Sequence, residues 1–215
     1  MTGFKPFGGS SVNPSELVAR SLEGRLIAGR RVVARVFPVE TSEVGQLLRR
    51  AFEEEQPELV VCTGVAAGQT AVSLERVAVN MLDFEQPDDA GEERKNEPIL
   101  RGGPDARLSP MPIGEIVEAW QSNGIPGYVS NSAGTYLCNQ IFYEALGMAE
   151  SVSPPVTAGF IHLPCLPEQA IAAGAGTTPS MSLELMQRAV ELAIAAAVTS
   201  IEKRNAGRHA AAAGV

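Results

Sequence analysis

The amino-acid sequence predicts a single α/β domain in which a mainly parallel, twisted β-sheet lies between two layers of helices. Short β-branched runs alternate with longer segments of helical periodicity, the pattern of strands joined by crossover helices. The chain has 215 residues, 45% hydrophobic and 20% charged, so it can bury one large core. It has no internal repeat and no linker-like segment that would divide it. We therefore expect one domain over residues 1–204.

The individual elements are predicted from runs of residues that share one periodicity. Strands are expected where β-branched and apolar residues concentrate or alternate, at 30–39, 58–65, 72–81, 127–132 and 156–164. Helices are expected where apolar residues recur with helical spacing, at 42–55, 113–124, 136–147 and 181–204. Ser42 is a candidate N-cap, and Gly124 marks the end of its helix.

Two segments are expected to lie outside this regular pattern. Residues 83–110 are polar and rich in Pro, Gly and charged residues, which predicts a long surface loop with a short hairpin. We also expect this loop to be mobile and to act as a lid. The alanine-rich residues 205–215 are predicted to form a frayed tail.

The overall charge and the cysteine count exclude several classes of protein. The formal net charge of −8 argues against binding to nucleic acid or to an acidic membrane surface, since both need clustered Lys and Arg. No apolar run approaches the roughly 20 residues of a membrane span. The opening MTGFKPFGG shows no secretory signal. Three widely spaced cysteines, an odd number, predict reduced thiols and a cytoplasmic location.

A cysteine and a histidine form the candidate reactive pair. In α/β sheets, ligands bind in loops at strand ends, and Glu75, Cys138 and His162 all fall near such ends. Cys138 lies in the first turn of its predicted helix, where free backbone N–H groups and the helix dipole favour a thiolate and can bind an oxyanion. The only other histidine, His209, lies in the tail. A base for Cys138 would therefore be His162.

Each of these residues also has a purely structural interpretation. On periodicity alone, Cys138 fits a packed helix residue as well as a nucleophile, and His162 fits a buried, hydrogen-bonded histidine. Glu75 alternates with apolar residues, so it is either a solvated carboxylate beside Arg76 or the group that orients the base. Cys62 lies inside an apolar run and is interpreted as a core residue.

Metal and nucleotide sites receive little support from the sequence. The spacing from His162 to Cys165 is compatible with metal ligation, but zinc needs further nitrogen or sulfur ligands and the chain offers no second cluster of His or Cys. We predict no metal and no cofactor. The glycine-containing turns TGFKPFGG and TGVAAG lack the Lys and Ser/Thr of a phosphate loop, so nucleotide binding is the weakest alternative.

Four separated segments resemble the signature segments of pyroglutamyl peptidase I, a family of cysteine peptidases. In chain order they are TGFKPFGGSSVNPS (2–15), GVAAGQTAVSLERVAVN (64–80), YVSNSAGTYLCN (128–139) and FIHLPCLPEQ (160–169). The resemblance spans most of residues 2–169. It places the catalytic glutamate, cysteine and histidine of the family on Glu75, Cys138 and His162.

The resemblance implies an activity, a pocket and an assembly. The activity is removal of an N-terminal pyroglutamyl residue from peptides, through a thioester on Cys138 and without a cofactor. The assembly is a homotetramer. Because the pyroglutamyl ring is flat, neutral and half apolar, its pocket needs apolar walls and a few backbone hydrogen bonds. The implied lining residues are Phe4, Phe7, Val65, Tyr136 and Leu137, with plain core packing as the alternative for Phe4 and Phe7.

Departures from the family pattern keep two further functions open. Glu85 stands where the family usually has an arginine, and Val65 stands where many members have a polar residue. We expect a carboxylate near the thiolate to weaken activity, and a catalytically silent pyroglutamate-binding protein is one alternative. Another Cys-His-Glu amidohydrolase, such as a glutaminase, is the second. Leu137 and Asn139 beside Cys138 argue against it, because its nucleophile is expected on a Gly-x-Cys-x-Gly elbow.

Overall fold

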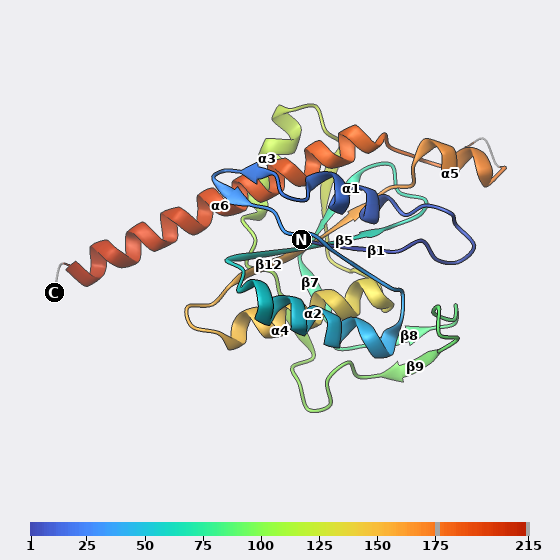
Figure 1. Cartoon of the computed structure of the whole chain (residues 1–215), viewed down its shortest axis with the longest axis horizontal. Helices are drawn as coiled ribbons and strands as arrows, with labels where there is room; N and C mark the ends of the chain where they lie inside the picture. Colours follow the sequence, from blue (N-terminus) through green and yellow to red (C-terminus); the bar gives the residue numbers. More distant parts are fainter. Residues whose placement is uncertain (175–176, 214–215) are drawn as a thin grey trace.

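The computed structural model describes residues 1–174 and 177–213, and a six-stranded sheet lies at its centre (Figure 1). The strand order is β11-β6-β12-β5-β1-β4. All neighbours in this sheet pair in parallel except β12 and β6, which are antiparallel. The predicted α/β class with a mainly parallel sheet is confirmed. The strands are β1 (Thr2–Phe4), β4 (Arg35–Phe37), β5 (Leu59–Val65), β6 (Val72–Glu75), β11 (Gly127–Ser130) and β12 (Thr157–Leu163).

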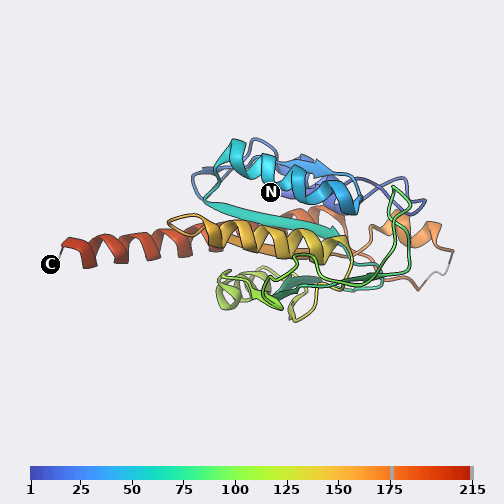
Figure 2. The ribbon, with the colours of Figure 1, turned by 90° about the horizontal axis from the view of Figure 1, so that it is seen from below.

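Helices cover both faces of this sheet, as Figures 1 and 2 show from two directions. One apolar core lies under α2 (Thr41–Glu55) and α4 (Leu137–Ser151). The other lies under α1 (Pro14–Leu22), α3 (Ile113–Ser122) and α6 (Leu183–Ala213). Burial on both faces explains why all seven residues of β12 are buried and why its sequence is almost entirely apolar.

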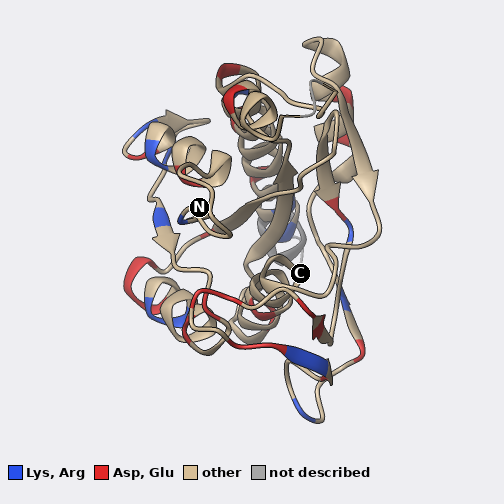
Figure 3. Ribbon diagram, turned by 90° about the vertical axis from the view of Figure 1, so that its right-hand side faces the viewer, with Lys and Arg blue, Asp and Glu red and all other residues tan. Residues whose placement is uncertain are grey.

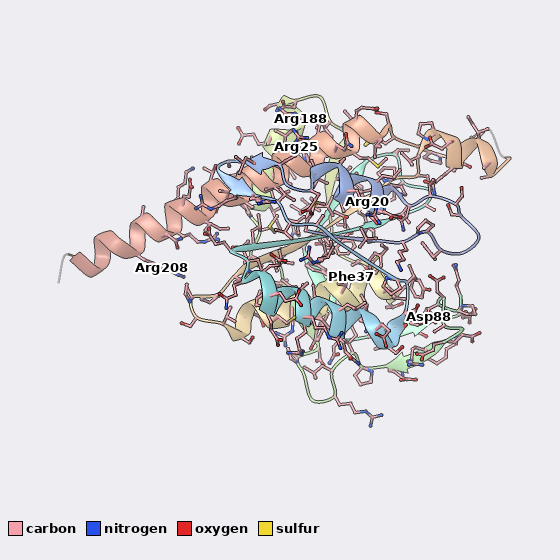
Figure 4. All side chains as sticks on the ribbon, viewed as in Figure 1. Arg20, Arg25, Phe37, Asp88, Arg188 and Arg208 are labelled. Carbon is pink, nitrogen blue, oxygen red and sulfur yellow. The ribbon has the colours of Figure 1, made fainter. Side chains whose placement is uncertain are left out.

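The polar segment 83–110 does contain a hairpin, as predicted. Strand β8 (Leu82–Phe84) pairs antiparallel with β9 (Arg94–Glu97). Asp88, labelled in Figure 4, anchors the turn between them, because its carboxylate accepts a 2.7 Å hydrogen bond from the backbone N–H of Thr41 at the start of α2. Asp88 also accepts from the N–H groups of Ala90 and Glu92. The mobility of the segment as a lid stays a prediction.

Two predicted strands are shorter than their sequence runs. Residues 30–39 divide into β3 (Arg30–Arg31), which pairs with β2 (Leu26–Ile27), and β4 in the central sheet. Residues 72–81 divide into β6 and β7 (Val77–Val79), and β7 pairs with β10 (Ala106–Leu108). The predicted strand 72–81 divides after Glu75. This residue ends β6, and it pairs with Ser130, the last residue of β11.

Helix α1 was not predicted, although its N-terminus carries two signals. Asn13 caps the helix by accepting a hydrogen bond from the Ser15 N–H, and Pro14 occupies the first helical position. The hydroxyl of Ser15 in turn accepts from the N–H of Phe4, which ties β1 to α1. Gly3 permits this approach, since a Cβ at that position would lie 2.3 Å from the Ser15 carbonyl oxygen. The short helix α5 (Pro167–Ala172) was also not predicted.

The C-terminal helix is longer than the sequence indicated. We expected it to end at 204, but α6 continues to Ala213 and its last part extends beyond the body of the domain (Figures 1 and 2). The boundary at 204 was wrong because the following residues are rich in alanine, which has the highest helix propensity. Fraying of 205–215 stays a prediction, and residues 214–215 lie outside the described part of the chain.

Acidic and basic residues are interspersed over the domain. Figure 3 shows stretches of both signs next to one another rather than one continuous basic face. Among the described residues, no helix has the length and apolar character that crossing a membrane requires.

Candidate active site

His162 lies near the carboxyl end of β12, an interior strand of the sheet. Its side chain is 8% exposed, and its Nδ1 lies 2.8 Å from Oε1 of Glu75. The ring of Phe160 packs edge-on against the imidazole, with centroids 4.7 Å apart. Because Nδ1 is engaged with Glu75, Nε2 is the ring nitrogen left for another partner.

Glu75 ends strand β6 and is completely buried. Since β6 runs antiparallel to β12, its residues at positions 73 and 75 face positions 162 and 160 of β12. The Glu75 side chain reaches His162 diagonally across these two strands. Its Oε1 also accepts a 2.9 Å hydrogen bond from the Ser73 hydroxyl. The alternative that Glu75 is a solvated carboxylate is wrong, because Glu75 is completely buried. Arg76, its neighbour in the sequence, donates to Asn131.

Cys138 is the second residue of α4, as the first-turn prediction requires. The residue before the helix, Tyr136, makes no side-chain cap hydrogen bond. First-turn N–H groups of a helix have no partner within the helix, and the positive end of its dipole lies beside the thiol. Cys138 is half-buried, and it is the neighbour that raises the pKa of His162 most.

The glycine at the end of β5 makes room for this thiol. A Cβ at Gly64 would lie 2.6 Å from the Cys138 Sγ and 2.9 Å from the ring of Phe160. Any side chain here would displace the thiol or the ring that packs on His162. Gly64 is thus a steric requirement of the site, a role that the sequence alone did not reveal.

The charge on the imidazole is governed by two negative neighbours. Burial alone would lower the pKa of His162, but the Cys138 thiolate and then the Glu75 carboxylate outweigh it and raise that pKa to about 9. At neutral pH the imidazole of His162 therefore favours its protonated form. A protonated imidazole next to a cysteine favours the thiolate form that a nucleophile needs.

Comparison with known proteins establishes the family. A family model described as pyroglutamyl peptidase matches residues 1–200. The chain belongs to this family. Related proteins include the pyrrolidone-carboxylate peptidases of Pyrococcus furiosus (41% identical, covering 94% of this chain and 98% of the relative) and Klebsiella pneumoniae (44%, covering 92% and 91%). The resemblance that the four segments predicted is confirmed.

Solved structures of the pyroglutamyl peptidase family share this fold. A mutant pyrrolidone carboxyl peptidase from Pyrococcus furiosus superposes with a TM-score of 0.90 at 40% identity, covering 93% of this chain and 97% of that chain. Pyroglutamyl peptidase I from Bacillus amyloliquefaciens gives 0.88 at 36% identity, with coverage of 92% and 95%. The fold of this family member is thus that of the family over nearly its whole length.

The five residues predicted for the pyroglutamyl pocket differ in their burial. Phe7 and Tyr136 are partly exposed, and their ring centroids are 6.4 Å apart. Phe4 and Leu137 are buried in the core under α2 and α4. Val65 is half-buried at the end of β5. Contact of all five with substrate stays a prediction for this member of the family.

One aromatic residue of this region was missed. Phe84 packs edge-on against Tyr136, with centroids 4.6 Å apart, so the β8–β9 hairpin contributes to the ring cluster. The signal in the sequence is the alternation Leu82-Asp83-Phe84, which interrupts an otherwise polar segment. The pKa of Tyr136 is raised to about 12, by burial and then by the nearby Asp88 and Asp89, which keeps its phenol neutral.

Glu85, at the family's arginine position, lies on the β8–β9 hairpin and pairs with a lysine. Its carboxylate is 85% exposed and pairs at 2.7 Å with the ammonium group of Lys95 across the hairpin. Lys95 lowers the pKa of this carboxyl. The hairpin exposes Glu85 to solvent, and its effect on the thiolate and on activity stays a prediction.

The other two cysteines lie outside this arrangement. Cys62 is fully buried in the core, and burial raises the pKa of its thiol to about 11, as its structural interpretation requires. Cys165 is also buried. Among the residues that the structure describes, no group of three or more His, Cys, Asp or Glu is arranged to hold a metal ion.

Proposed function

We propose that this chain is a cysteine peptidase that removes an N-terminal pyroglutamyl residue from peptides, with Cys138 as nucleophile, His162 as acid and base, and Glu75 as the residue that orients His162. The observation that carries the proposal is the buried pair of Glu75 and His162, with Cys138 raising the pKa of that imidazole, in a member of the pyroglutamyl peptidase family.

The first half of the reaction forms a thioester. The Cys138 thiolate attacks the pyroglutamyl carbonyl carbon, and the carbonyl oxygen becomes an oxyanion that the first-turn N–H groups of α4 can bind. The C–N bond then breaks, and the His162 imidazolium gives its proton to the departing amine nitrogen. The shortened peptide leaves with a free amine.

The second half releases pyroglutamate. His162, now neutral, accepts a proton from a water molecule that attacks the thioester carbonyl. Collapse of the second tetrahedral intermediate breaks the C–S bond and restores the thiolate and imidazolium. Throughout, Glu75 accepts the Nδ1 hydrogen bond, which leaves Nε2 directed at the reacting atoms.

The pocket is expected to recognise a neutral ring. We propose that Phe7, Tyr136 and Phe84 supply the apolar wall, since the rings of Phe7 and Phe84 both lie against Tyr136, two residues before Cys138. A free α-amine would bring a positive charge into this apolar wall at a desolvation cost. This explains a preference for a lactam over an ordinary N-terminus.

Location and assembly also belong to this proposal. Cys62, Cys138 and Cys165 are all free, which supports a reducing compartment such as the cytoplasm. A homotetramer is proposed from the family resemblance alone. Light scattering coupled to size-exclusion chromatography, at several protein concentrations, distinguishes a tetramer from a monomer or a dimer.

The activity is tested with pyroglutamyl-β-naphthylamide, with prolyl-β-naphthylamide as matched control and free glutamine as competing substrate. We expect release of naphthylamine from the first compound only, because the prolyl ring lacks the lactam carbonyl and carries a charged amine. Ammonia from glutamine without naphthylamine would instead identify an amidohydrolase. Binding of pyroglutamate by calorimetry without any turnover would identify a silent homologue.

A further inference from the structure

The hydroxyl of Ser73 is bonded to the same carboxylate oxygen as the catalytic imidazole. Ser73 lies on β6 two residues before Glu75, so both side chains leave the strand on the same face. Its Oγ donates to Glu75 Oε1 at 2.9 Å, while His162 Nδ1 lies 2.8 Å from that oxygen. Ser73 is completely buried, and it is the residue directly opposite His162 across the antiparallel pair.

The hydrogen bond from Ser73 matters because of the second oxygen of the Glu75 carboxylate. Oε2 of Glu75 is buried and has no hydrogen-bond partner among the described residues. All the hydrogen bonding that holds this carboxylate therefore converges on Oε1, from His162 and Ser73. Without the Ser73 hydroxyl, the buried carboxylate would keep only His162 as a partner and could rotate about its terminal bond. That rotation would take Oε1 away from Nδ1.

A nearby amide competes for the serine proton. Oε1 of Gln69, in the turn that follows β5, lies 3.4 Å from the Ser73 Oγ. A hydroxyl carries one proton, so it donates to either Glu75 or Gln69. The shorter distance and the charge of the carboxylate both favour Glu75.

We propose that Ser73 is a positioning residue of the reaction: its hydroxyl fixes the Glu75 carboxylate with Oε1 towards Nδ1, so that Nε2 of His162 faces Cys138. This inference rests on the proposed function. Ser73 acts through Glu75 and His162 and touches neither substrate nor thiol. Its loss should therefore lower kcat and leave KM nearly unchanged.

The test compares Ser73→Ala with Ser73→Thr and with a matched control. A hydrogen bond to a charged group contributes about 1.5–3 kcal/mol, so we expect kcat for pyroglutamyl-β-naphthylamide to fall by about 10- to 100-fold in Ser73→Ala, with KM within about twofold. Ser73→Thr keeps the hydroxyl and should restore most of the rate. The control is Thr63→Val, which removes another fully buried hydroxyl. Thr63 lies on β5, which β12 separates from β6, and its hydroxyl donates to the Thr2 carbonyl at 2.7 Å.

A double-mutant cycle separates positioning from simple destabilisation. If Ser73 acts through the Glu75 carboxylate, Ser73→Ala should have little further effect on kcat in a Glu75→Gln background. An equal loss of kcat in both backgrounds would overturn the proposal. The proposal would also be overturned if Ser73→Ala and Thr63→Val lost similar thermal stability while Ser73→Ala kept its kcat within twofold of the wild type. If Ser73→Ala does not fold, Ser73→Cys replaces it, because a thiol of similar size is a weak donor.

A spectroscopic measurement tests the contact without any turnover. The Nδ1 proton of His162 is expected to give a low-field NMR resonance that shifts upfield or broadens in Ser73→Ala and stays in place in Thr63→Val. An unchanged resonance in Ser73→Ala would contradict the positioning role. If the wild-type chain does not hydrolyse the pyroglutamyl amide, the proposed function fails, and this resonance still decides whether Ser73 fixes the Glu75–His162 pair.

Discussion

Two carboxylate–cation pairs of this protein have almost the same length but lie in opposite environments. Glu75 and His162 are 2.8 Å apart in the centre of the sheet, with side chains 1% and 8% exposed. Glu85 and Lys95 are 2.7 Å apart on the β8–β9 hairpin, with side chains 85% and 58% exposed. The separation of the charged atoms therefore does not distinguish the two pairs, whereas burial does.

Burial determines where a charged side chain can control chemistry in this fold. An exposed pair is screened by water and ions, and loss of either member leaves a charge that water can solvate. In the buried pair, loss of one member leaves the other uncompensated in a low-dielectric interior. The sequence suggested that the charge reversal at Glu85 would control activity. The burial of Glu75 and His162 leads us to expect a larger effect on activity from the pair on β6 and β12.

The largest effect is expected when the buried base is removed. His162→Ala should lower kcat by at least about 10⁴-fold, because residues that act as one catalytic unit lose nearly all activity together. The matched control is a chain truncated before residue 205, which removes His209 and should keep kcat within about twofold. A folded truncated chain without activity would contradict the assignment of the base.

Removing the charge of the buried carboxylate should have the next largest effect. Glu75→Gln keeps the shape of the side chain, and we expect kcat to fall by roughly 10³-fold, less than in His162→Ala because no bond-making atom is lost. Because Glu75 raises the pKa of His162, the fall in kcat/KM at alkaline pH should also move to lower pH in this variant. A pH–rate profile with the same alkaline limb in both proteins would argue against this coupling.

The buried pair should also make folding stability depend on pH. The pKa of His162 is raised from 6.5 to about 9 in the folded protein, so its contribution is fully present below about 6.5 and is lost as the pH rises through about 9. Between these values the free energy of unfolding should fall by roughly 1–3 kcal/mol more in the wild type than in His162→Ala. Urea unfolding at several pH values measures this difference, and parallel curves for the two proteins would contradict it.

The smallest effects are expected at the exposed pair. Glu85→Gln and Lys95→Gln should each keep kcat/KM within about twofold at physiological ionic strength, because screening acts over about 8–10 Å and both side chains face solvent. The pair of single variants and the double variant should be measured at low and high salt. A change beyond tenfold in either single variant would show that the hairpin charge reaches the site.

The proposed catalytic residues could be inferred from the sequence to different degrees. His162 was the candidate base by counting, because the other histidine lies in the alanine-rich tail. Cys138 lies at a helix start, but only the family resemblance favoured a nucleophile over a packed core residue. The burial of Glu75 did not follow, since alternation along β6 fits a solvated carboxylate equally well. Its contact with His162 depends on the antiparallel pairing of β6 with β12, which no local pattern encodes.

The fold shows the same division between local and non-local information. The sheet class and the long helices follow from periodicity, and α1 could have been found from Asn13 and Pro14. The strand order could not, because it depends on which strands meet across long stretches of chain. For the same reason the packing of Phe84 on Tyr136, 52 residues apart, appears only in the folded chain.

The central claim is that Cys138 is the nucleophile of a pyroglutamyl peptidase. The most direct test is the rate at which wild type, Cys138→Ser and Cys165→Ser hydrolyse pyroglutamyl-β-naphthylamide under identical conditions. We predict no measurable turnover by Cys138→Ser and a near-normal rate for Cys165→Ser, both with intact folds by circular dichroism. A near-normal rate in Cys138→Ser, or abolished turnover in a folded Cys165→Ser, would contradict the account.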